Sequence, residues 1–326
     1  MDVSLKKLIQ AAISAGLLLA LSFFVDWQAV VMNLRQASPV WLALAAATVI
    51  LARLAITWRW MILLRVSGGG ARLRRLFGIV SAGIGVGSLI PTSVGPDIMR
   101  GALLARHSQV ASGDAQVGQI VSSLLLDRIA AMFGTFLVAV LATTLTGFWS
   151  AAIPLAAVLA AGVSAFFLAI RSGPDVVSAL VPERFGKLRE KTRGLLQRLR
   201  EPGFVRRSFP AAVAVSTLMT LARTLMFLFL YRAFGYQVPL DHALVMIPLL
   251  LIALIAPISF GGLGLREWVL VVGFQGIGIP PAVSVSVGIL SFALQLVVSA
   301  PWVLAHMAGW DTQRPDVGAA KSFSER

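Results

Sequence analysis

The sequence has no cysteine and only a small share of charged residues. Without cysteine, disulfide bonds and thiolate metal sites are excluded. Charged residues make up 13% of the 326 positions, whereas a soluble domain carries about 25%. The three histidines (His107, His242 and His306) are scattered without the spacing of a metal site. We therefore expect no metal and no cofactor.

Motifs of known catalytic sites are also missing. The sequence has no Walker-type phosphate loop, no Gly-x-Ser-x-Gly motif and no His-Glu-x-x-His motif. No stretch outside the apolar segments is long enough for a catalytic domain, and the longest, residues 171–208, is mostly basic. An ATP-driven pump is therefore not expected.

Apolar residues are abundant. They make up 58% of the chain and give it a mean hydropathy of +0.86, which indicates an integral membrane protein. The net charge of +14 lies beside the apolar runs, a pattern typical of membrane topology and of contact with anionic lipid. Nucleic-acid binding is not expected.

Six apolar runs have the length of about 20 residues that a membrane span needs. They lie at about 8–25, 40–63, 117–145, 151–170, 209–230 and 282–306. The first follows Lys6 and Lys7 as a signal peptide would, but it is long and lacks a cleavage site, so an uncleaved span is expected. Two further apolar segments, about 76–95 and 243–276, are interrupted by Pro and Gly.

One ten-residue pattern, Pro-x-Ser-x-Gly-x-x-x-x-Arg, occurs once in each interrupted segment. Its defining residues are Pro91, Ser93, Gly95 and Arg100 in the first copy, and Pro257, Ser259, Gly261 and Arg266 in the second. Pro and Gly break a helix and free its backbone groups. Broken apolar segments at matching positions of two halves indicate the substrate site of a transporter. The alternative is two independent breaks, since both residues are common in membrane helices.

The charges of the loops predict the orientation in the membrane. Residues 64–75 carry four arginines and no acid, and residues 171–208 carry ten basic residues against four acidic ones. The opposite loops, 26–39, 146–150 and 231–242, are nearly uncharged. Because short basic loops stay in the cytoplasm, the N-terminus, both basic loops and the C-terminus are predicted to lie inside.

This orientation makes both interrupted segments re-entrant. Segment 76–95 must enter and leave from the inside, and segment 243–276 from the outside. The predicted fold is an all-α polytopic membrane protein with an inverted-topology repeat, about six spanning helices and two re-entrant hairpins. The predicted repeats are 1–150 and 151–326, each with two spans, a hairpin and a last span.

Four ionisable residues fall well inside predicted spans: Arg53, Arg223, Asp127 and Arg128. Both Arg53 and Arg223 end a Leu-Ala-Arg triplet, and the triplets are 170 residues apart against 166 for the two motifs, which supports the repeat. A charge at this depth costs at least about 2.5–3.5 kcal/mol and indicates function. Asp127 is expected to meet Arg53 or Arg223, and Arg128 a hairpin carbonyl or a lipid phosphate. The alternative is a buried ion pair that only sets helix register.

The hairpin tips carry the other candidates for substrate binding. These are Ser93, Gly95, Asp97 and Arg100 in the first tip, and Ser259, Gly261, Gly262, Arg266 and Glu267 in the second. Half-helix N-termini attract anions, and Arg holds phosphate by two hydrogen bonds, so each tip is predicted to bind a phosphate. The alternative is that Asp97–Arg100 and Arg266–Glu267 are local pairs that hold each hairpin shut.

Two regions are expected at the membrane surface. Arg59 stands between Trp58 and Trp60 near the cytoplasmic end of its span, and it is expected to snorkel to the interface. Loop 171–208 has apolar positions at partly helical spacing, so a short amphipathic helix in contact with anionic inner-leaflet lipid is predicted.

The same residues carry a family resemblance. The run from Pro91 to Arg100, the pair Asp127-Arg128, and the segment Gly-Gly-Leu-Gly-Leu-Arg-Glu that ends at Glu267 resemble the lysylphosphatidylglycerol synthase transmembrane family. Most of the chain is covered, although Gly95-Pro96-Asp97 stands where Gly-Gly-Asp is expected. Because the chain ends at Arg326, a stand-alone member without the synthase domain is expected.

The resemblance implies a flippase-like protein of the bacterial cytoplasmic membrane. Its expected substrate is an anionic, zwitterionic or polyisoprenoid lipid headgroup, moved by alternating access, with membrane phospholipid or polyprenyl lipid as partner. The rival is a membrane glycosyltransferase that uses a polyprenyl phosphate, with Asp97 or Glu267 as base or metal ligand. A third possibility is a scaffold for another enzyme, and no oligomeric state is predicted.

Overall fold

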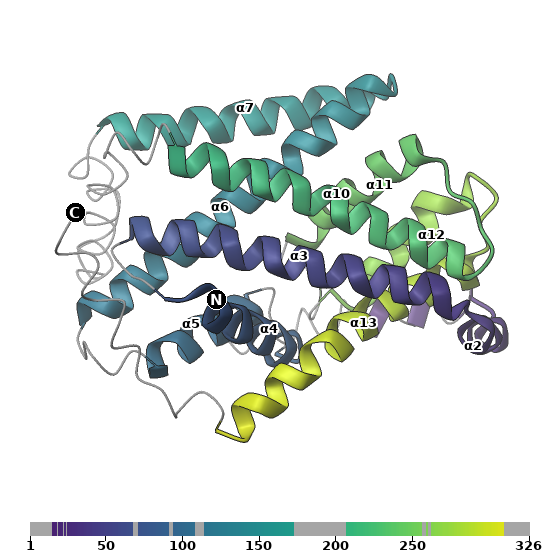
Figure 1. Ribbon diagram of the computed structural model, residues 1–326. Helices are drawn as coiled ribbons and strands as arrows, with labels where there is room; N and C mark the ends of the chain where they lie inside the picture. Colours follow the sequence, from purple (N-terminus) through teal and green to yellow (C-terminus); the bar gives the residue numbers. More distant parts are fainter. Residues whose placement is uncertain are drawn as a thin grey trace. The chain divides into compact units, whose positions relative to one another are not determined.

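Figure 1 shows the computed structural model, which describes residues 15–17, 19–21, 23, 25–67, 71–90, 94–107, 114–172, 207–255, 259 and 262–309. These residues form helices and connecting turns, with no strand among them. Five of their helices are long and apolar enough to cross a membrane: α3 (Pro39–Val66), α6 (Asp114–Leu145), α7 (Trp149–Ser172), α10 (Phe209–Ala233) and α13 (Pro281–Met307).

The chain is therefore a polytopic all-α membrane protein, as predicted. The five long helices coincide with five of the six predicted spans. The remaining span, 8–25, lies mostly outside the described residues, although 15–17, 19–21 and 23 are helical.

The chain divides into two compact units. Unit 1 comprises Met1–Arg53, Ser81–Arg100 and Thr220–Met307, and unit 2 comprises Leu54–Val80, Gly101–Met219 and Ala308–Arg326. Each unit takes segments from both predicted repeats. The inverted-topology repeat, with its halves 1–150 and 151–326, therefore stays a prediction.

Both interrupted segments form two short helices separated at the repeated motif. Hairpin 1 consists of α4 (Leu73–Ser88) and α5 (Gly95–His107), and hairpin 2 of α11 (Leu240–Ile255) and α12 (Leu265–Gln275). Each helix is shorter than the roughly 20 residues that a complete crossing needs. That the hairpins are re-entrant stays a prediction.

Glycines bring the two arms of hairpin 1 into backbone contact. A methyl group at Gly83 would lie 2.8 Å from the backbone nitrogen of Arg100, and one at Gly87 would lie 2.5 Å from that of Pro96. The later glycine on α4 meets the earlier residue on α5, so the two arms are antiparallel. Glycines four residues apart allow this close approach of membrane helices.

Hairpin 2 is closed by side chains as well as by a glycine. The Nε2 atom of His242 on α11 lies 2.7 Å from the carbonyl oxygen of Gly273 on α12. Met246, one turn further along α11, packs on Gly273, with its sulfur 3.2 Å from where a methyl group would stand. Near the break, Leu254 of α11 lies 3.0 Å from where a methyl group at Gly262 would stand, so the two arms are again antiparallel.

The second arm of hairpin 1 is longer than predicted. The apolar segment was expected to end at residue 95, but α5 continues to His107. Pro96 is compatible with the first turn of a helix, where no backbone N–H is needed. Asp97 in the same turn complements the helix dipole. The charged residues Asp97 and Arg100 therefore belong to the first half of a helix.

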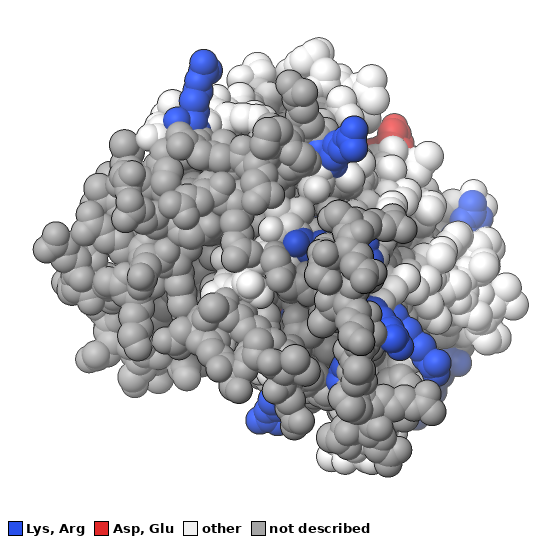
Figure 2. Space-filling view, turned by 60° about the vertical axis from the view of Figure 1, so that its left-hand side comes forward, with Lys and Arg blue, Asp and Glu red and all other residues white. Residues whose placement is uncertain are grey.

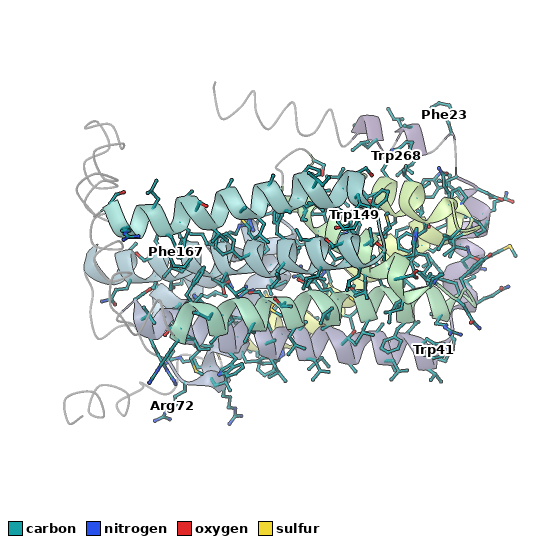
Figure 3. All side chains as sticks on the ribbon, turned by 90° about the horizontal axis from the view of Figure 1, so that it is seen from above. Phe23, Trp41, Arg72, Trp149, Phe167 and Trp268 are labelled. Atoms are coloured by element: carbon teal, nitrogen blue, oxygen red, sulfur yellow. The ribbon has the colours of Figure 1, made fainter. Side chains whose placement is uncertain are left out.

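A short helix, α2 (Trp27–Gln36), lies in the predicted loop 26–39. Asp26 begins it, because its side chain accepts hydrogen bonds from the backbone nitrogens of Gln28 and Ala29 at 2.9 and 3.1 Å. Within unit 1, Val30 of α2 packs with residues of the N-terminal segment, α12 and α13. This cluster anchors the described part of the N-terminal segment. The indole of Trp268, a residue of α12 that is labelled in Figure 3, also donates to the Leu17 carbonyl at 3.1 Å.

In unit 2, α6 and α7 pack side by side (Figure 1). Phe133, Phe166 and Phe209 form an aromatic cluster with ring centroids 4.4–5.9 Å apart. Much of α7 is nevertheless exposed, including Trp149 near its beginning and Phe167 near its end (Figure 3). Such an apolar exposed surface suits contact with lipid chains.

Basic side chains outnumber acidic ones among the described residues on the face shown in Figure 2. The exposed arginines of unit 2 are Arg65, Arg72, Arg74, Arg106, Arg171 and Arg207. Arg171 and Arg207 lie at the two ends of the predicted basic loop, whose residues 173–206, with the predicted amphipathic helix, are outside the described residues. Contact of this loop with anionic lipid stays a prediction.

Candidate functional site

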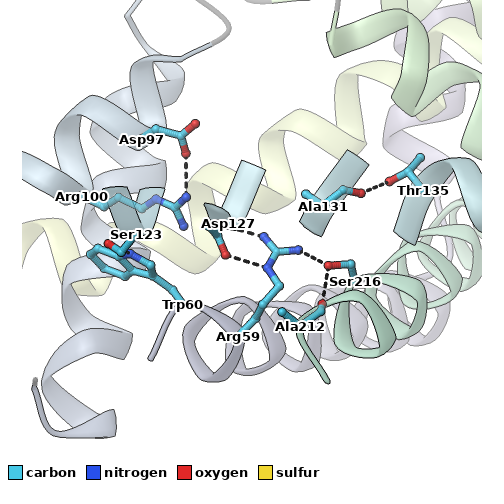
Figure 4. Close-up of polar contacts among 10 residues, drawn as sticks. All are labelled: Arg59, Trp60, Asp97, Arg100, Ser123, Asp127, Ala131, Thr135, Ala212 and Ser216. Atoms are coloured by element: carbon cyan, nitrogen blue, oxygen red, sulfur yellow. Dashed lines mark hydrogen bonds and ion pairs between the residues drawn. The ribbon is translucent and has the colours of Figure 1, made fainter. Parts of the chain in front are cut away.

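Unit 2 contains a buried ion pair between α3 and α6. The Arg59 guanidinium binds the Asp127 carboxylate through two hydrogen bonds, Nε–Oδ1 at 2.7 Å and Nη2–Oδ2 at 3.0 Å. Its Nη1 atom donates to the Ser216 hydroxyl of α10 at 2.8 Å (Figure 4). Arg59 is 4% exposed and Asp127 is 1% exposed. The three helices are thus joined by one hydrogen-bond network.

One prediction about these residues was wrong, because Arg59 is buried and does not snorkel to the interface. Asp127 binds Arg59, and a contact of Asp127 with Arg53 or Arg223 stays a prediction. The flanking tryptophans do not indicate the position of Arg59, because successive side chains on a helix point about 100° apart. Trp58 is 51% exposed, whereas Trp60 is fully buried and donates its indole N–H to Ser123 at 3.1 Å.

The network in unit 2 is balanced in charge and in hydrogen bonds. Both carboxylate oxygens of Asp127 accept from Arg59, and the Ser216 hydroxyl donates onward to the Ala212 carbonyl at 2.7 Å. Arg128, the next residue on α6, is half-buried and points about 100° away. Asp127 therefore fits the alternative prediction of a buried ion pair that fixes helix packing.

Unit 1 contains a different arrangement around Arg53. This side chain is 2% exposed, and it donates to two backbone carbonyls, Ser81 of α4 at 3.2 Å and Gln295 of α13 at 3.1 Å. These two hydrogen bonds join Arg53 to the backbone of α4 and of α13. Arg223 of α10, also in unit 1, is half-buried.

Arg266 is the second buried cation of unit 1. It lies in the first turn of α12, after a glycine turn in which Gly262 and Gly264 have φ of 81° and 77°, a backbone that favours glycine. The guanidinium stacks over Phe292 of α13, 5.4 Å from the ring centroid. Arg266 is 9% exposed, and its Nη1 atom has no hydrogen-bond partner among the described residues.

The neighbouring Glu267 caps α12. Its Oε2 atom accepts a hydrogen bond from the Gly264 backbone nitrogen at 2.9 Å, as a glutamate three residues into a helix commonly does. The carboxylate packs on Gly288 of α13, where a methyl group would lie 3.0 Å from Oε1. Glu267 is buried, and its charge attracts Arg266 without forming a close ion pair with it.

The contacts of both hairpins and of Arg53 lie on one face of α13. Gly288 meets Glu267, Phe292 lies under Arg266, Gln295 accepts from Arg53, and Ser299 packs on Gly85 of hairpin 1. Successive contacts are three or four residues apart, which places them on one side of the helix. Arg53 therefore lies between the contacts of hairpin 2 and those of hairpin 1 along α13.

The first hairpin tip is internally paired. The Arg100 Nη2 atom lies 2.9 Å from Asp97 Oδ1 (Figure 4), which is the local pair considered as the alternative for this tip. Gly95 begins α5 against the Gly87 carbonyl, and Ser259 of the second motif is buried. Ser93 and Gly261 lie outside the described residues.

The described helices of unit 1 carry more arginines than carboxylates away from their exposed surface. Arg53, Arg100 and Arg266 are buried and Arg223 is half-buried, whereas the carboxylates are those of the buried Glu267 and the half-buried Asp97. No group of three or more potential metal ligands occurs in the part of the chain that the structure describes.

Long apolar helices, two broken hairpins and a cationic interior define a multi-pass membrane protein with a polar site inside unit 1. A search of curated proteins finds no match. The family model described as Lysylphosphatidylglycerol synthase TM region matches residues 7–301, nearly the whole chain. The protein belongs to this family, and the resemblance seen in the sequence is confirmed.

Proposed function

We propose that the protein moves the headgroup of an anionic, zwitterionic or polyisoprenoid lipid between the leaflets of the bacterial cytoplasmic membrane. The N- and C-termini would face the cytoplasm, and the headgroup would bind in the interior of unit 1. The observation that carries this proposal is the buried Arg266, whose Nη1 atom has no hydrogen-bond partner among the described residues.

A buried charge without a close counter-ion is expensive. The effective penalty for burying an ion is several kcal/mol, and Glu267 offsets it only in part because its carboxylate caps α12. A headgroup phosphate supplies the missing negative charge and accepts two hydrogen bonds from a guanidinium. Arg266 is therefore suited to hold a charged headgroup that enters and leaves.

The architecture of unit 1 supports movement rather than permanent binding. Many transporters place their substrate at discontinuous helices whose half-helix N-termini point at anionic groups. The α12 helix begins at such a break, and both hairpins meet the same face of α13. Rocking of the hairpins about this helix would expose the site to either leaflet by alternating access.

The alternative function, a membrane glycosyltransferase, has less support. A glycosyltransferase needs an acidic group free to act as base or metal ligand. The two acids proposed for this role already have structural tasks, since Asp97 binds Arg100 and Glu267 caps α12. Unit 1 offers a cationic binding surface and little that would carry out covalent chemistry.

Changing Arg266→Gln is expected to slow lipid translocation by about tenfold or more, because a hydrogen bond to a charged group contributes about 1.5–3 kcal/mol. The measurement uses purified protein in liposomes with fluorescent phosphatidylglycerol, phosphatidylethanolamine and a polyprenyl phosphate in turn. Dithionite quenching of the outer leaflet reports the movement. Arg266→Lys should be intermediate, since lysine keeps the charge but not the paired hydrogen bonds.

The matched control is Arg35→Gln, which makes the same chemical change on the exposed side of α2 and should leave the rate unchanged. Folding of each variant is checked by size-exclusion chromatography and helical circular dichroism. A folded Arg266→Gln protein that moves lipid at the unaltered rate would refute the role of Arg266. A folded parent protein that moves none of the three lipids would refute the function.

A further inference from the structure

We propose that Phe292 of α13 is a positioning residue for the headgroup site. Its aromatic ring holds the charged end of Arg266 in place and leaves the N–H donors of the guanidinium to a headgroup phosphate. This inference rests on the proposed function, because it names a residue that acts through Arg266 at the same site. It follows from the way in which α13 contacts the first turn of α12.

The guanidinium of Arg266 has two described neighbours. Its central carbon lies over the ring of Phe292, 5.4 Å from the ring centroid. Its Nη2 atom lies 3.6 Å from where a methyl group at Gly262 would stand, so the guanidinium is next to the glycine turn that begins α12. Its Nη1 atom has no hydrogen-bond partner among the described residues. The charged end of Arg266 is therefore located by packing rather than by an acceptor at each nitrogen.

An aromatic ring stabilises such a charge without using its hydrogen bonds. The face of the ring is negative and attracts a cation, and the attraction is stronger where water is excluded. Arg266 is 9% exposed, so the attraction acts on a desolvated charge. The ring of Phe292 has no oxygen or nitrogen that could accept a hydrogen bond. It therefore lowers the cost of burying the charge and takes up none of the donors that a phosphate needs.

The second observation is that α13 keeps Arg266 apart from its neighbour Glu267. The Glu267 carboxylate accepts from the Gly264 backbone nitrogen and packs on Gly288, with Oε1 3.0 Å from where a methyl group would stand. Phe292 is four residues after Gly288, which is about one helical turn. The two charged side chains thus rest on successive turns of α13. Without the ring, the attraction of Glu267 would draw the guanidinium toward the carboxylate.

Changing Phe292→Leu is expected to weaken lipid binding about tenfold, because leucine is apolar but does not attract the guanidinium. Purified full-length protein in detergent is titrated with a mixture of dioleoyl phosphatidylglycerol, dioleoyl phosphatidylethanolamine and a polyprenyl phosphate. Native mass spectrometry separates the bound lipids by mass. The double variant Phe292→Leu/Arg266→Gln should bind no more weakly than Arg266→Gln alone, since Phe292 acts through Arg266. Losses that add in the double variant would overturn the inference.

A graded change of the ring separates its charge distribution from its shape. Monofluoro-, difluoro- and trifluorophenylalanine at position 292 keep nearly the same size, but the fluorines withdraw electrons from the ring face and weaken its attraction for a cation in steps. Lipid affinity should fall in the same order, by about tenfold for the trifluoro ring. The control is the same series at Phe166, whose ring contacts are with other phenylalanines. An unaltered affinity along the series at Phe292 would show that the ring acts only by its shape, and would overturn the inference.

The outcomes separate this inference from the proposed function. A parent protein that binds and moves lipid, with no response to fluorination at Phe292, would keep the function and refute the positioning role. A folded parent protein that binds none of the three lipids would refute both. Only a lipid that Arg266 holds should follow the fluorine series. The same titration therefore shows whether the phosphate belongs to a glycerolipid or to a polyprenyl lipid.

Discussion

Replacing Asp127 with leucine is expected to lower the free energy of unfolding by about 3–5 kcal/mol. The substitution leaves the Arg59 guanidinium buried at 4% exposure without its carboxylate. In the described part of unit 2, Ser216 is the only other side chain that is hydrogen-bonded to Arg59, and a hydroxyl cannot neutralise the charge. Chemical unfolding in detergent micelles, followed by circular dichroism, measures the change.

The double variant Arg59→Met/Asp127→Leu should recover most of this loss. Replacing both members of a buried ion pair by apolar residues of similar volume is often neutral or stabilising. Ser216 keeps its hydrogen bond to the Ala212 carbonyl, so no hydroxyl is left unsatisfied. Arg35→Met on the exposed surface of α2 is the control and should change stability by no more than about 1 kcal/mol. If the double variant loses as much free energy of unfolding as the two single variants together, the two residues act independently.

The membrane fold follows from simple properties of the sequence. Length and apolar composition located five spans, and the observed α10 and α13 differ from the predicted 209–230 and 282–306 by three residues or fewer at either end. Proline and glycine located both breaks between helices. These signals succeed because a bilayer imposes a minimum apolar length and requires every backbone group to be bonded internally.

Partners of the buried charges could not be predicted in the same way. Span α3 is apolar on all sides, so its sequence has no polar face to show which way Arg53 or Arg59 points. Trp58 and Trp60 suggested an interface, whereas the decisive contact came from Asp127, 68 positions away. The contact that sets the distance between α6 and α10 was also missed. A methyl group at Gly134 would collide with Ser216, 2.7 Å from its carbonyl carbon.

The two copies of the motif show why a repeated sequence need not give a repeated site. Both copies end in an arginine, but the acid stands three positions before Arg100 and one position after Arg266. Three positions bring Asp97 over Arg100 on one helix face, whereas the next residue on the helix points elsewhere. Glu267 is thereby directed to the end of α12. In hairpin 1 the arginine pairs with the acid of its own helix, whereas in hairpin 2 Glu267 caps α12 and forms no close ion pair with Arg266.

The close contact inside hairpin 1 leads to the second large effect. Changing Gly87→Ala is expected to lower the free energy of unfolding by about 1–3 kcal/mol, the usual range for overpacking. The added methyl group would lie 2.5 Å from the Pro96 backbone nitrogen and 2.7 Å from the Gly95 carbonyl carbon. These are backbone atoms, which cannot move aside as a side chain would. The arms of hairpin 1 must separate, and lipid translocation should fall with them.

Gly118→Ala on α6 provides the matched control, because a methyl group there meets nothing within 4 Å. Alanine is favoured over glycine inside a helix by about 0.5–1 kcal/mol, so this variant should be as stable as the parent or more so. The expected change in the free energy of unfolding thus has opposite signs at the two positions. Comparing the two variants separates the effect of packing from that of helix propensity. A Gly87→Ala protein that is more stable than the parent would show that the arms of hairpin 1 are not in backbone contact. A destabilised Gly87→Ala protein that still translocates lipid at the full rate would separate hairpin packing from transport.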